Sequence, residues 1–309
     1  MRFRSYPRIG GPTQPMAGTW VATEKIHGAN FVIGFTADRV MFGKRKAWLT
    51  DDDAFFGWRL IATELEARVR DVARQVAAVQ LVCYGELFGG RYPHPEVAAV
   101  PGLGPVQTGV WYAPDLRWAM FDVLVATGDD DPGELLAFAD IEALGRQAGI
   151  LTPPVLGRGK RDDLERIPVD APTAVPIQLG LPEIDANRRE GFVLKPDRRA
   201  PATTRPMSKW KLPDFDDARF DEAQAWKPGW LSSDELIAWA LRLVNPARVA
   251  SARSKVGTDP RAIEDEIVLD VMIDLAAVFA DAWRELDSAR EAELQTAIRA
   301  AATAILGAP

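Results

Sequence analysis

The sequence predicts an α+β domain followed by a small all-helical domain. Three observations carry this prediction. The chain has 309 residues, 47% of them hydrophobic and 26% charged, which is typical of a globular protein large enough for two domains. Short β-rich runs dominate up to about residue 214, and a helical period replaces them after residue 215. The predicted domains are residues 1–218 and 219–309.

The first predicted elements are a hairpin, a helix and two strands. FVIGFTADRVMFGKR (31–45) has two β-rich runs around a polar turn at Thr36–Arg39. Apolar residues recur at helical spacing between Phe55 and Val79. Residues 81–88 and 117–126 read as further strands. The stretch between these strands is rich in proline and glycine, and a loop of that length is expected to have a functional reason.

Later segments complete the two domains. Residues 183–196 and 206–214 read as strands that end at proline. Ser232 or Ser233 gives an N-cap signal for a helix, and an apolar stripe at steps of three and four runs from Ile263 to Leu286. Residues 291–306 predict a last helix.

The charge is acidic overall but uneven. A net charge of −7 disfavours a protein that coats nucleic acid non-specifically. Residues 185–211, however, contain eight basic and three acidic residues, and residues 241–256 contain four basic residues and no acidic one. Two local basic surfaces could therefore still contact a phosphate backbone.

Several classes of protein are disfavoured. The single cysteine, Cys83, excludes an intramolecular disulfide and lies in an apolar run, as a buried residue would. No stretch reaches the ~18–20 apolar residues of a membrane span, and the N-terminus lacks the apolar core of a secretory signal, so a cytoplasmic protein without membrane contact is expected. Two histidines, His27 and His94, without CxxC or HExxH, argue against structural zinc. Neither GxSxG nor a P-loop motif is present.

Six segments combine charge, glycine and strand character. They are EKIHGAN (24–30), KRK (44–46), YGELFGG (84–90), WAMFDV (118–123), EGFVLK (190–195) and KWK (209–211). In this order they resemble the covalent nucleotidyltransferase superfamily of ATP-dependent ligases and capping enzymes, and are most similar to the RNA ligase 2 type. The resemblance covers residues 20–214. A lone KxHG would be weak, but six ordered motifs are specific.

The resemblance implies a fold and an activity. The fold is a nucleotidyltransferase domain of ATP-grasp-like antiparallel sheets with helices, followed by a helical RNA-binding domain. The activity is ATP-dependent RNA ligation, in which Lys25 takes AMP from ATP and passes it to a 5′-phosphate. A 3′-OH then displaces the AMP and seals the strand. ATP as co-substrate and Mg²⁺ or Mn²⁺ are implied.

The alternation in KWK supports this role for Lys25. A lysine of ordinary pKa ~10.4 is a poor nucleophile at neutral pH, and nearby cations or desolvation can lower that value. Lys209 and Lys211 flank Trp210 on a predicted strand, so both ammonium groups point to one face. There they could neutralise the triphosphate and lower the pKa of Lys25. A solvated strand edge stays open as the alternative.

The resemblance also implies nucleotide contacts. Phe121 would stack on adenine, although a core phenylalanine stays possible, and Glu86 would accept a hydrogen bond from a ribose hydroxyl. Glu190 would hold a divalent metal or Lys25. His27, where many relatives carry aspartate, would position the lysine or the pyrophosphate, or stabilise a turn. The remaining implied nucleotide contacts are Glu24, Ile26, Asn30, Arg45, Glu190, Lys209 and Lys211. Lys195 reads as a phosphate contact or a surface lysine.

The helical domain is expected to hold RNA. NPARVASARSKVG (245–257) offers Arg248, Arg253, Ser254 and Lys255, which would position phosphates rather than read bases. Asp270 and Asp274, one turn apart, are expected to face solvent. The predicted substrate is RNA with 3′-OH and 5′-phosphate ends, in a nicked or bridged duplex, and protein partners are not predicted. Two other readings stay open: a GTP-dependent RNA-capping guanylyltransferase, and a non-catalytic RNA-end-binding protein that retains an AMP pocket.

Overall fold

The computed structural model describes residues 1–10, 17–37, 39–215 and 227–307. The chain forms two compact units. The first contains Met1–Thr50, Arg68–Ala99 and Pro105–Ala225, and the second contains Asp51–Ala67, Val100–Gly104 and Trp226–Pro309. The first unit holds both sheets and the second is helical, so the predicted α+β fold with a helical C-terminal part is confirmed. The predicted boundary at residue 218 lies outside the described residues.

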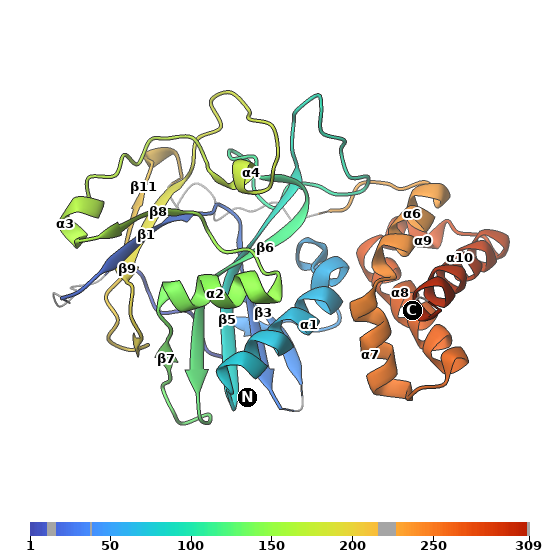
Figure 1. The fold of residues 1–309 in the computed structure, drawn as a ribbon. Helices are drawn as coiled ribbons and strands as arrows, with labels where there is room; N and C mark the ends of the chain where they lie inside the picture. Colours follow the sequence, from blue (N-terminus) through green and yellow to red (C-terminus); the bar gives the residue numbers. More distant parts are fainter. Residues whose placement is uncertain (11–16, 38, 216–226, 308–309) are drawn as a thin grey trace. The chain divides into compact units, whose positions relative to one another are not determined.

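The first unit contains a four-stranded antiparallel sheet (Figure 1). Its strands, in spatial order, are β11 (Ser208–Lys211), β9 (Gly191–Pro196), β1 (Trp20–Lys25) and β8 (Val155–Gly159). One face packs as a small core that includes Trp20, Phe192 and Trp210, with the last two rings stacked at 5.4 Å. Because side chains alternate along a strand, Lys25, Lys195, Lys209 and Lys211 lie on the other face.

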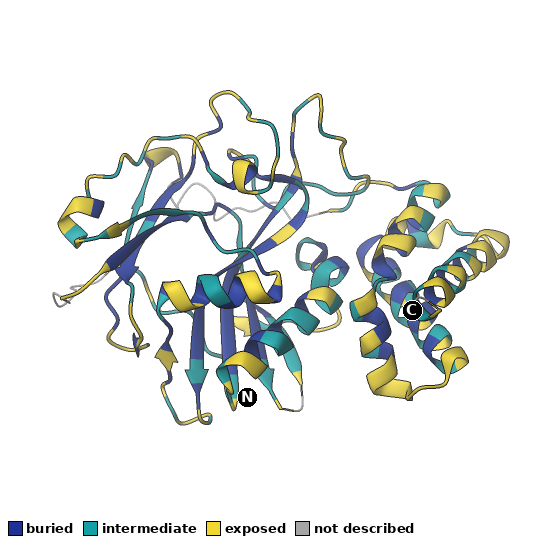
Figure 2. Ribbon diagram, viewed as in Figure 1, coloured by how far each residue is buried: buried dark blue, intermediate teal, exposed yellow. Residues whose placement is uncertain are grey.

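A seven-stranded antiparallel sheet forms the rest of this unit. Its spatial order is β10 (Ala200–Pro201), β7 (Glu134–Leu135), β6 (Ala113–Ala126), β5 (Gln80–Arg91), β2 (Ala29–Thr36), β3 (Val40–Lys44) and β4 (Ala47–Trp48). Strands β2 and β3 confirm the predicted hairpin. Helix α2 (Phe138–Ala148) packs against β6, and shorter helices follow in the chain: α3 (Arg161–Leu164), α4 (Val175–Gln178) and η2 (Pro213–Phe215). The strands are mostly buried while the helices expose one side (Figure 2).

A β-bulge interrupts the pairing of β5 with β6. Tyr84 pairs with Asp122 and Gly85 with Met120, so Phe121 is an extra residue without a partner in register. A bulge of this kind brings two consecutive side chains to the same face of a sheet. Phe121 and Asp122 therefore both project on the face that carries Tyr84.

The predicted strand at 183–196 is only half correct. The ladder begins at Gly191, because residues 183–190 are held by side-chain and loop bonds instead. Asn187 bonds both backbone groups of Trp111, and Arg189 N–H donates to the carbonyl of Ala171. The proline- and glycine-rich loop between β5 and β6 contains no helix or strand in its described residues, as predicted.

The second unit is a bundle of helices around one apolar core. Its helices are η1 (Phe55–Gly57), the start of α1 (Arg59–Val76), α6 (Ser233–Leu243), α7 (Pro246–Val256), α8 (Pro260–Val278), α9 (Ala280–Arg284) and α10 (Ser288–Leu306). Ser232 caps α6 in a capping box with Glu235, as predicted. The apolar stripe spans two helices rather than one, because Phe279 leaves the helical conformation at φ −112° and ψ 48°. No helix in the described ranges is long and apolar enough to cross a membrane.

The core of this unit also uses residues from far upstream. Leu60 packs with Leu236, Ile267 and Leu294 in the same cluster. The indole N–H of Trp239 donates to the carbonyl of Pro101 at 3.0 Å. The helical unit is therefore not a continuous C-terminal segment.

Candidate active site

Lys25 ends strand β1 and faces a buried carboxylate. Its Nζ lies 2.7 Å from Glu190 Oε2, and His27 Nδ1 lies 3.4 Å from the same oxygen. The Lys25 side chain is 24% exposed, whereas that of Glu190 is 2% exposed. Burial alone would raise the pKa of Glu190, but Lys25 and His27 outweigh it and hold that pKa below its ordinary value. Glu190 is therefore ionised at neutral pH.

The register of the four-stranded sheet places Lys25, Lys209 and Lys211 on the face that also carries Lys195. Lys25 pairs with Gly191, and Gly191 pairs with Lys211 on the far side. Two strand spacings, about 10 Å, separate the backbones of the two lysines. A Cβ at Gly191 would lie 1.9 Å from the carbonyl oxygen of Trp210, so only glycine fits between them. The shared face of Lys209 and Lys211 is as the alternation predicts.

A polar row crosses the seven-stranded sheet. Asn30 pairs directly with Glu86. Arg45 lies in the turn that follows β3, and its charge acts on Glu86. Burial, reinforced by Glu190 and opposed by Lys25 and Arg45, raises the pKa of Glu86 to about 7. Asn30 Oδ1 is buried and accepts no hydrogen bond from the described residues. Close to Lys25, this row therefore offers the charges of Glu86 and Arg45 and a side-chain oxygen of Asn30 that can still accept a hydrogen bond.

Phe121 lies on the same face as this row, at the bulge. It is half-buried, and its ring meets that of Tyr6 at 5.0 Å. The Nζ of Lys195 donates to the Phe121 carbonyl and lies 3.1 Å from Asp122 Oδ2. Because Lys195 belongs to the four-stranded sheet, the lysine face of that sheet and the Glu86 face of the other enclose one region.

The sequence left two readings open for Lys195, and the surface reading is wrong. Lys195 is 1% exposed and lies 4.6 Å from the centre of the Phe138 ring. Burial lowers its pKa to about 8, although Asp122 acts in the opposite direction. Its ammonium group serves contacts inside the protein.

The side chains of Glu24 and Ile26 make contacts inside the protein and do not face the region around Lys25. The Glu24 carboxylate accepts hydrogen bonds from the Thr173 hydroxyl and from Ala174 N–H at 2.8 Å. Burial raises the pKa of Glu24. Ile26 is buried against Phe88 and its neighbours. A nucleotide contact at either position would use the backbone, and it stays a prediction.

Two aromatic residues near His27 escaped the sequence analysis. Tyr112 Oη accepts a hydrogen bond from His27 N–H at 2.8 Å, and the Phe215 ring meets the imidazole edge-on at 5.0 Å. Lys211 Nζ donates to the Phe215 carbonyl at 3.0 Å. Tyr112 lies at the end of the long loop for which a functional reason was expected, and this was the one available signal.

Comparison with known proteins gives the family. The RNA ligase family matches residues 18–211, which is more than half of the chain. The chain belongs to the RNA ligase family. It is 28% identical over 233 residues to RNA-editing ligase 2, mitochondrial, of Trypanosoma brucei brucei, covering 66% of this chain and 56% of that protein. To RNA-editing ligase 1, mitochondrial, it is 28% identical over 214 residues, or 59% and 46% of the two chains.

The match to the curated ligases is partial. The chain spans about half the length of these relatives. Among solved structures, a mutant of Naegleria gruberi RNA ligase with AMP and Mn matches with a TM-score of 0.45 and 15% identity, over 64% of this chain and 50% of that one.

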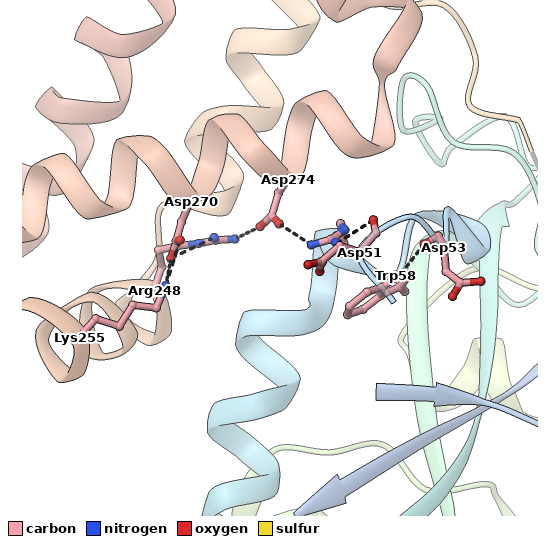
Figure 3. A network of polar contacts seen from close by, with 8 residues as sticks. Asp51, Asp53, Trp58, Arg248, Lys255, Asp270 and Asp274 are labelled. Carbon is pink, nitrogen blue, oxygen red and sulfur yellow. Dashed lines mark hydrogen bonds and ion pairs between the residues drawn. The ribbon is translucent and has the colours of Figure 1, made fainter. Parts of the chain in front are cut away.

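The predicted RNA contacts of this RNA ligase family member fall into two groups, and Figure 3 shows the first group, Arg248 and Lys255, with its acidic partners. Arg248 is 3% exposed, with Nη2 2.6 Å from Asp274 Oδ2. Lys255 Nζ lies 2.8 Å from both Asp270 Oδ2 and Glu266 Oε1. Asp270 and Asp274 pair with cations, so the expectation that they face solvent is wrong. Arg248 and Lys255 are engaged inside the helical unit.

Arg253 and Ser254 form the second group. Both are exposed on α7, and neither side chain has a hydrogen-bond or ion-pair partner within the described ranges. Arg59, at the start of α1, extends the internal network, with Nη1 3.8 Å from Asp274 Oδ1 and Nη2 2.8 Å from Asp51 Oδ1. Two of the three cations of α7, Arg248 and Lys255, are therefore paired with acidic residues, and Arg253 is the exception.

The residues near Lys25 fit a metal that arrives with phosphates. The described part of the chain contains no group of three or more His, Cys, Asp or Glu that could hold an ion by itself. Glu86 and Glu190 are close enough to influence each other's charge. Magnesium bound through nucleotide phosphates takes only one or two protein carboxylates. These two glutamates are the candidate ligands.

Proposed function

We propose that the chain is an ATP-dependent, AMP-forming RNA ligase that works through a lysyl-AMP intermediate on Lys25. The observation that carries the proposal is the setting of Lys25. Its amine lies 2.7 Å from Glu190 and close enough to Glu86 to act on its charge, and the two lysines of β11 project from the same sheet face. Family membership over residues 18–211 supports the same conclusion.

The first step is transfer of AMP to the enzyme. The Lys25 nitrogen attacks the α-phosphorus of ATP, an N–P bond forms, and the bond to pyrophosphate breaks. Glu190 Oε2, 2.7 Å from Nζ, is placed to accept the proton that leaves the amine. Lys209 and Lys211 would neutralise the triphosphate from the same sheet face. His27, held by Tyr112, would orient the lysine or the pyrophosphate.

The nucleotide would lie along the polar row of the seven-stranded sheet. Phe121 would stack on the base, which is worth about 1–3 kcal/mol and tolerates any base. Glu86 would bind a ribose hydroxyl, and Asn30 and Arg45 would contact the nucleotide or the 5′-phosphate end. A bound Mg²⁺ or Mn²⁺, near Glu190 and Glu86, would offset phosphate charge.

The next two steps join RNA ends. AMP passes from Lys25 to a 5′-phosphate, and a 3′-OH then displaces AMP to form the phosphodiester. We propose a nicked or bridged RNA duplex as substrate, with 2′-hydroxyls near the break distinguishing RNA from DNA. Arg253 and Ser254 are the α7 residues free to meet a phosphate. A cytoplasmic location stays a prediction.

A covalent-labelling assay tests the proposal. The full chain is incubated with labelled ATP or GTP and Mg²⁺ or Mn²⁺, then separated under denaturing conditions. Label from ATP is expected in the wild type and in Lys160→Ala, an exposed control, and none in Lys25→Ala. Label from GTP alone would indicate a capping enzyme. No label from either nucleotide would favour an RNA-end-binding protein and overturn the proposal.

A sealing assay then tests the substrate. We expect joining of a nicked RNA duplex with 3′-OH and 5′-phosphate ends to exceed joining of single strands. A duplex whose strand upstream of the nick is DNA should be sealed poorly. Equal sealing of RNA and DNA nicks would contradict the proposed RNA specificity while leaving the lysyl-AMP chemistry intact.

A further inference from the structure

We propose that Tyr6 is a positioning residue that fixes the ring of Phe121 and thereby sets the affinity of the site for the base of the nucleotide. The inference rests on the proposed function, because it takes Phe121 as the surface on which the base stacks. It adds an N-terminal residue that none of the six sequence motifs contains.

Tyr6 contacts both residues of the bulge. Its ring meets the Phe121 ring edge-on, with centroids 5.0 Å apart and an interplanar angle of 75°. Its hydroxyl donates to Asp122 Oδ2 at 2.7 Å. The Tyr6 ring also packs on the Tyr84 ring, with the centroids again 5.0 Å apart. Tyr6 therefore forms a wall beside Phe121 on the sheet face that carries Glu86.

The bulge explains why Phe121 needs this support. As the extra residue, Phe121 has no register partner on β5. Its carbonyl accepts from Lys195, and Asp122 is held by Lys195 and by Arg205 Nη1 at 2.9 Å. These contacts fix the backbone of the bulge. They do not orient the Phe121 ring, whose direction is set by Tyr6 and by the apolar residues under it.

The segment that carries Tyr6 is itself anchored. Arg4 donates to the carbonyls of Asp131 and Gly128, both at 2.6 Å, and Arg2 N–H donates to Asp129 at 3.1 Å. Phe3 packs edge-on against Trp48 at 4.9 Å. The N-terminal segment is therefore a fixed part of the seven-stranded sheet's surface, and Tyr6 is held at a defined place.

The geometry favours positioning over proton transfer. Burial, together with Asp122, raises the pKa of Tyr6 well above its ordinary value, so the hydroxyl stays protonated. That hydroxyl is already engaged by Asp122. Tyr6 can therefore act on a bound nucleotide only through the contact between its ring and the Phe121 ring.

Equilibrium binding to two probes tests the proposal. The affinity of the full chain is measured for α,β-methylene ATP, which cannot transfer AMP, and for inorganic tripolyphosphate, which has no base. Tyr6→Ala is expected to weaken binding of the ATP analogue about two- to tenfold, the range of an aromatic pair, and to leave tripolyphosphate binding unchanged. Tyr6→Phe keeps the ring and should stay within about twofold of the wild type.

Trp230→Ala is the control, because it removes an exposed aromatic ring that belongs to the helical unit and not to the N-terminal segment. It should change neither affinity. If Tyr6→Ala does not fold, Tyr6→Leu keeps apolar bulk and gives the same comparison. Equal weakening for both probes, or an ATP-analogue affinity of the Tyr6 variant like that of Trp230→Ala, would overturn the inference.

These outcomes are separable from failure of the proposed function. A wild type that takes no label from ATP and binds no ATP analogue defeats the proposed function. A wild type that is labelled, with a Tyr6→Ala variant of unchanged analogue affinity, defeats only the role of Tyr6.

Discussion

The cations that the sequence predicts to contact ligands are used in opposite ways by the two units. In the first unit, Lys25 keeps a quarter of its side chain exposed and faces one ionised carboxylate, Glu190. In the second unit, Arg248 is buried on Asp274, and Lys255 is shared by two acids. Counted along the sequence, the first unit has 27 basic and 26 acidic residues, whereas the second has 10 basic and 18 acidic.

The difference shows that neighbours in space decide what a cation does. The window 241–256 contains no acid, so by sequence it reads as a basic surface. Its acidic partners lie on α8, 11 to 26 residues further on, and they take up Arg248 and Lys255. An acidic surplus in the helical unit also weakens any general attraction for a phosphate backbone. We infer that α7 supports RNA binding through fewer contacts than its composition indicates.

The largest effect that would test this comparison is on stability. Arg248→Ala is expected to lower the free energy of unfolding of the helical unit by about 3–5 kcal/mol, because it leaves Asp274, whose side chain is only 13% exposed, without its main cation. Urea unfolding followed by circular dichroism at 222 nm measures this. Replacing the whole pair, in Arg248→Met with Asp274→Leu, should recover most of the loss.

Arg253→Ala is the control for that prediction. It lies five residues further along the same helix, is exposed, and should change the free energy of unfolding by no more than about 0.5 kcal/mol. If Arg248→Ala costs no more than Arg253→Ala, Arg248 is not an internal clamp, and its role as an RNA contact regains support.

A second effect, of intermediate size, concerns the carboxylate of the other unit. Folding raises the pKa of Glu86 to about 7 from its ordinary 4.5, mainly by burial. The stability that this group contributes is complete below pH 4.5 and is lost as the pH rises through about 7, because the folded state favours the protonated acid. The Glu86→Gln side chain cannot ionise, so the variant does not lose this stability as the pH rises.

The expected result is a pH-dependent gain in the variant. Relative to the wild type, the free energy of unfolding of Glu86→Gln should rise by about 1–3 kcal/mol between pH 4.5 and pH 8, allowing for partial screening by solvent. Denaturant titrations at several pH values provide the difference curve. A flat difference would mean that Glu86 ionises freely and does not sit in the low-polarity setting described above.

Much of the first unit could be predicted from the sequence, because the features concerned depend on residues close together in the chain. The hairpin at 31–45, the strands around Cys83 and Phe121, and the shared face of Lys209 and Lys211 depend on alternation within one strand. The partners of Arg248 and the ladder that omits residues 183–190 depend on contacts across the chain, which periodicity does not encode. The role of Tyr6 also depends on such contacts, because its partners lie more than 70 residues away in the sequence. Asp122, a charge between the apolar residues 118–121 and 123–126 of β6, was the one sequence signal of a buried network beside Phe121.

The smallest predicted effect compares two cations two residues apart on α7. Arg253→Ala should weaken binding of a nicked RNA duplex about two- to threefold and reduce the slope of log affinity against log salt by about 1, since one phosphate contact is lost. Lys255→Ala should leave that slope unchanged, because Glu266 and Asp270 already hold the ammonium group. Fluorescence anisotropy with a labelled duplex over 50–200 mM salt, a range in which contacts are countable, measures both. Equal slopes for the two variants, both below the wild type, would mean that RNA draws Lys255 out of its ion pairs. Wild-type slopes in both would mean that α7 makes no phosphate contact, and the difference between the units would then extend to the whole helix.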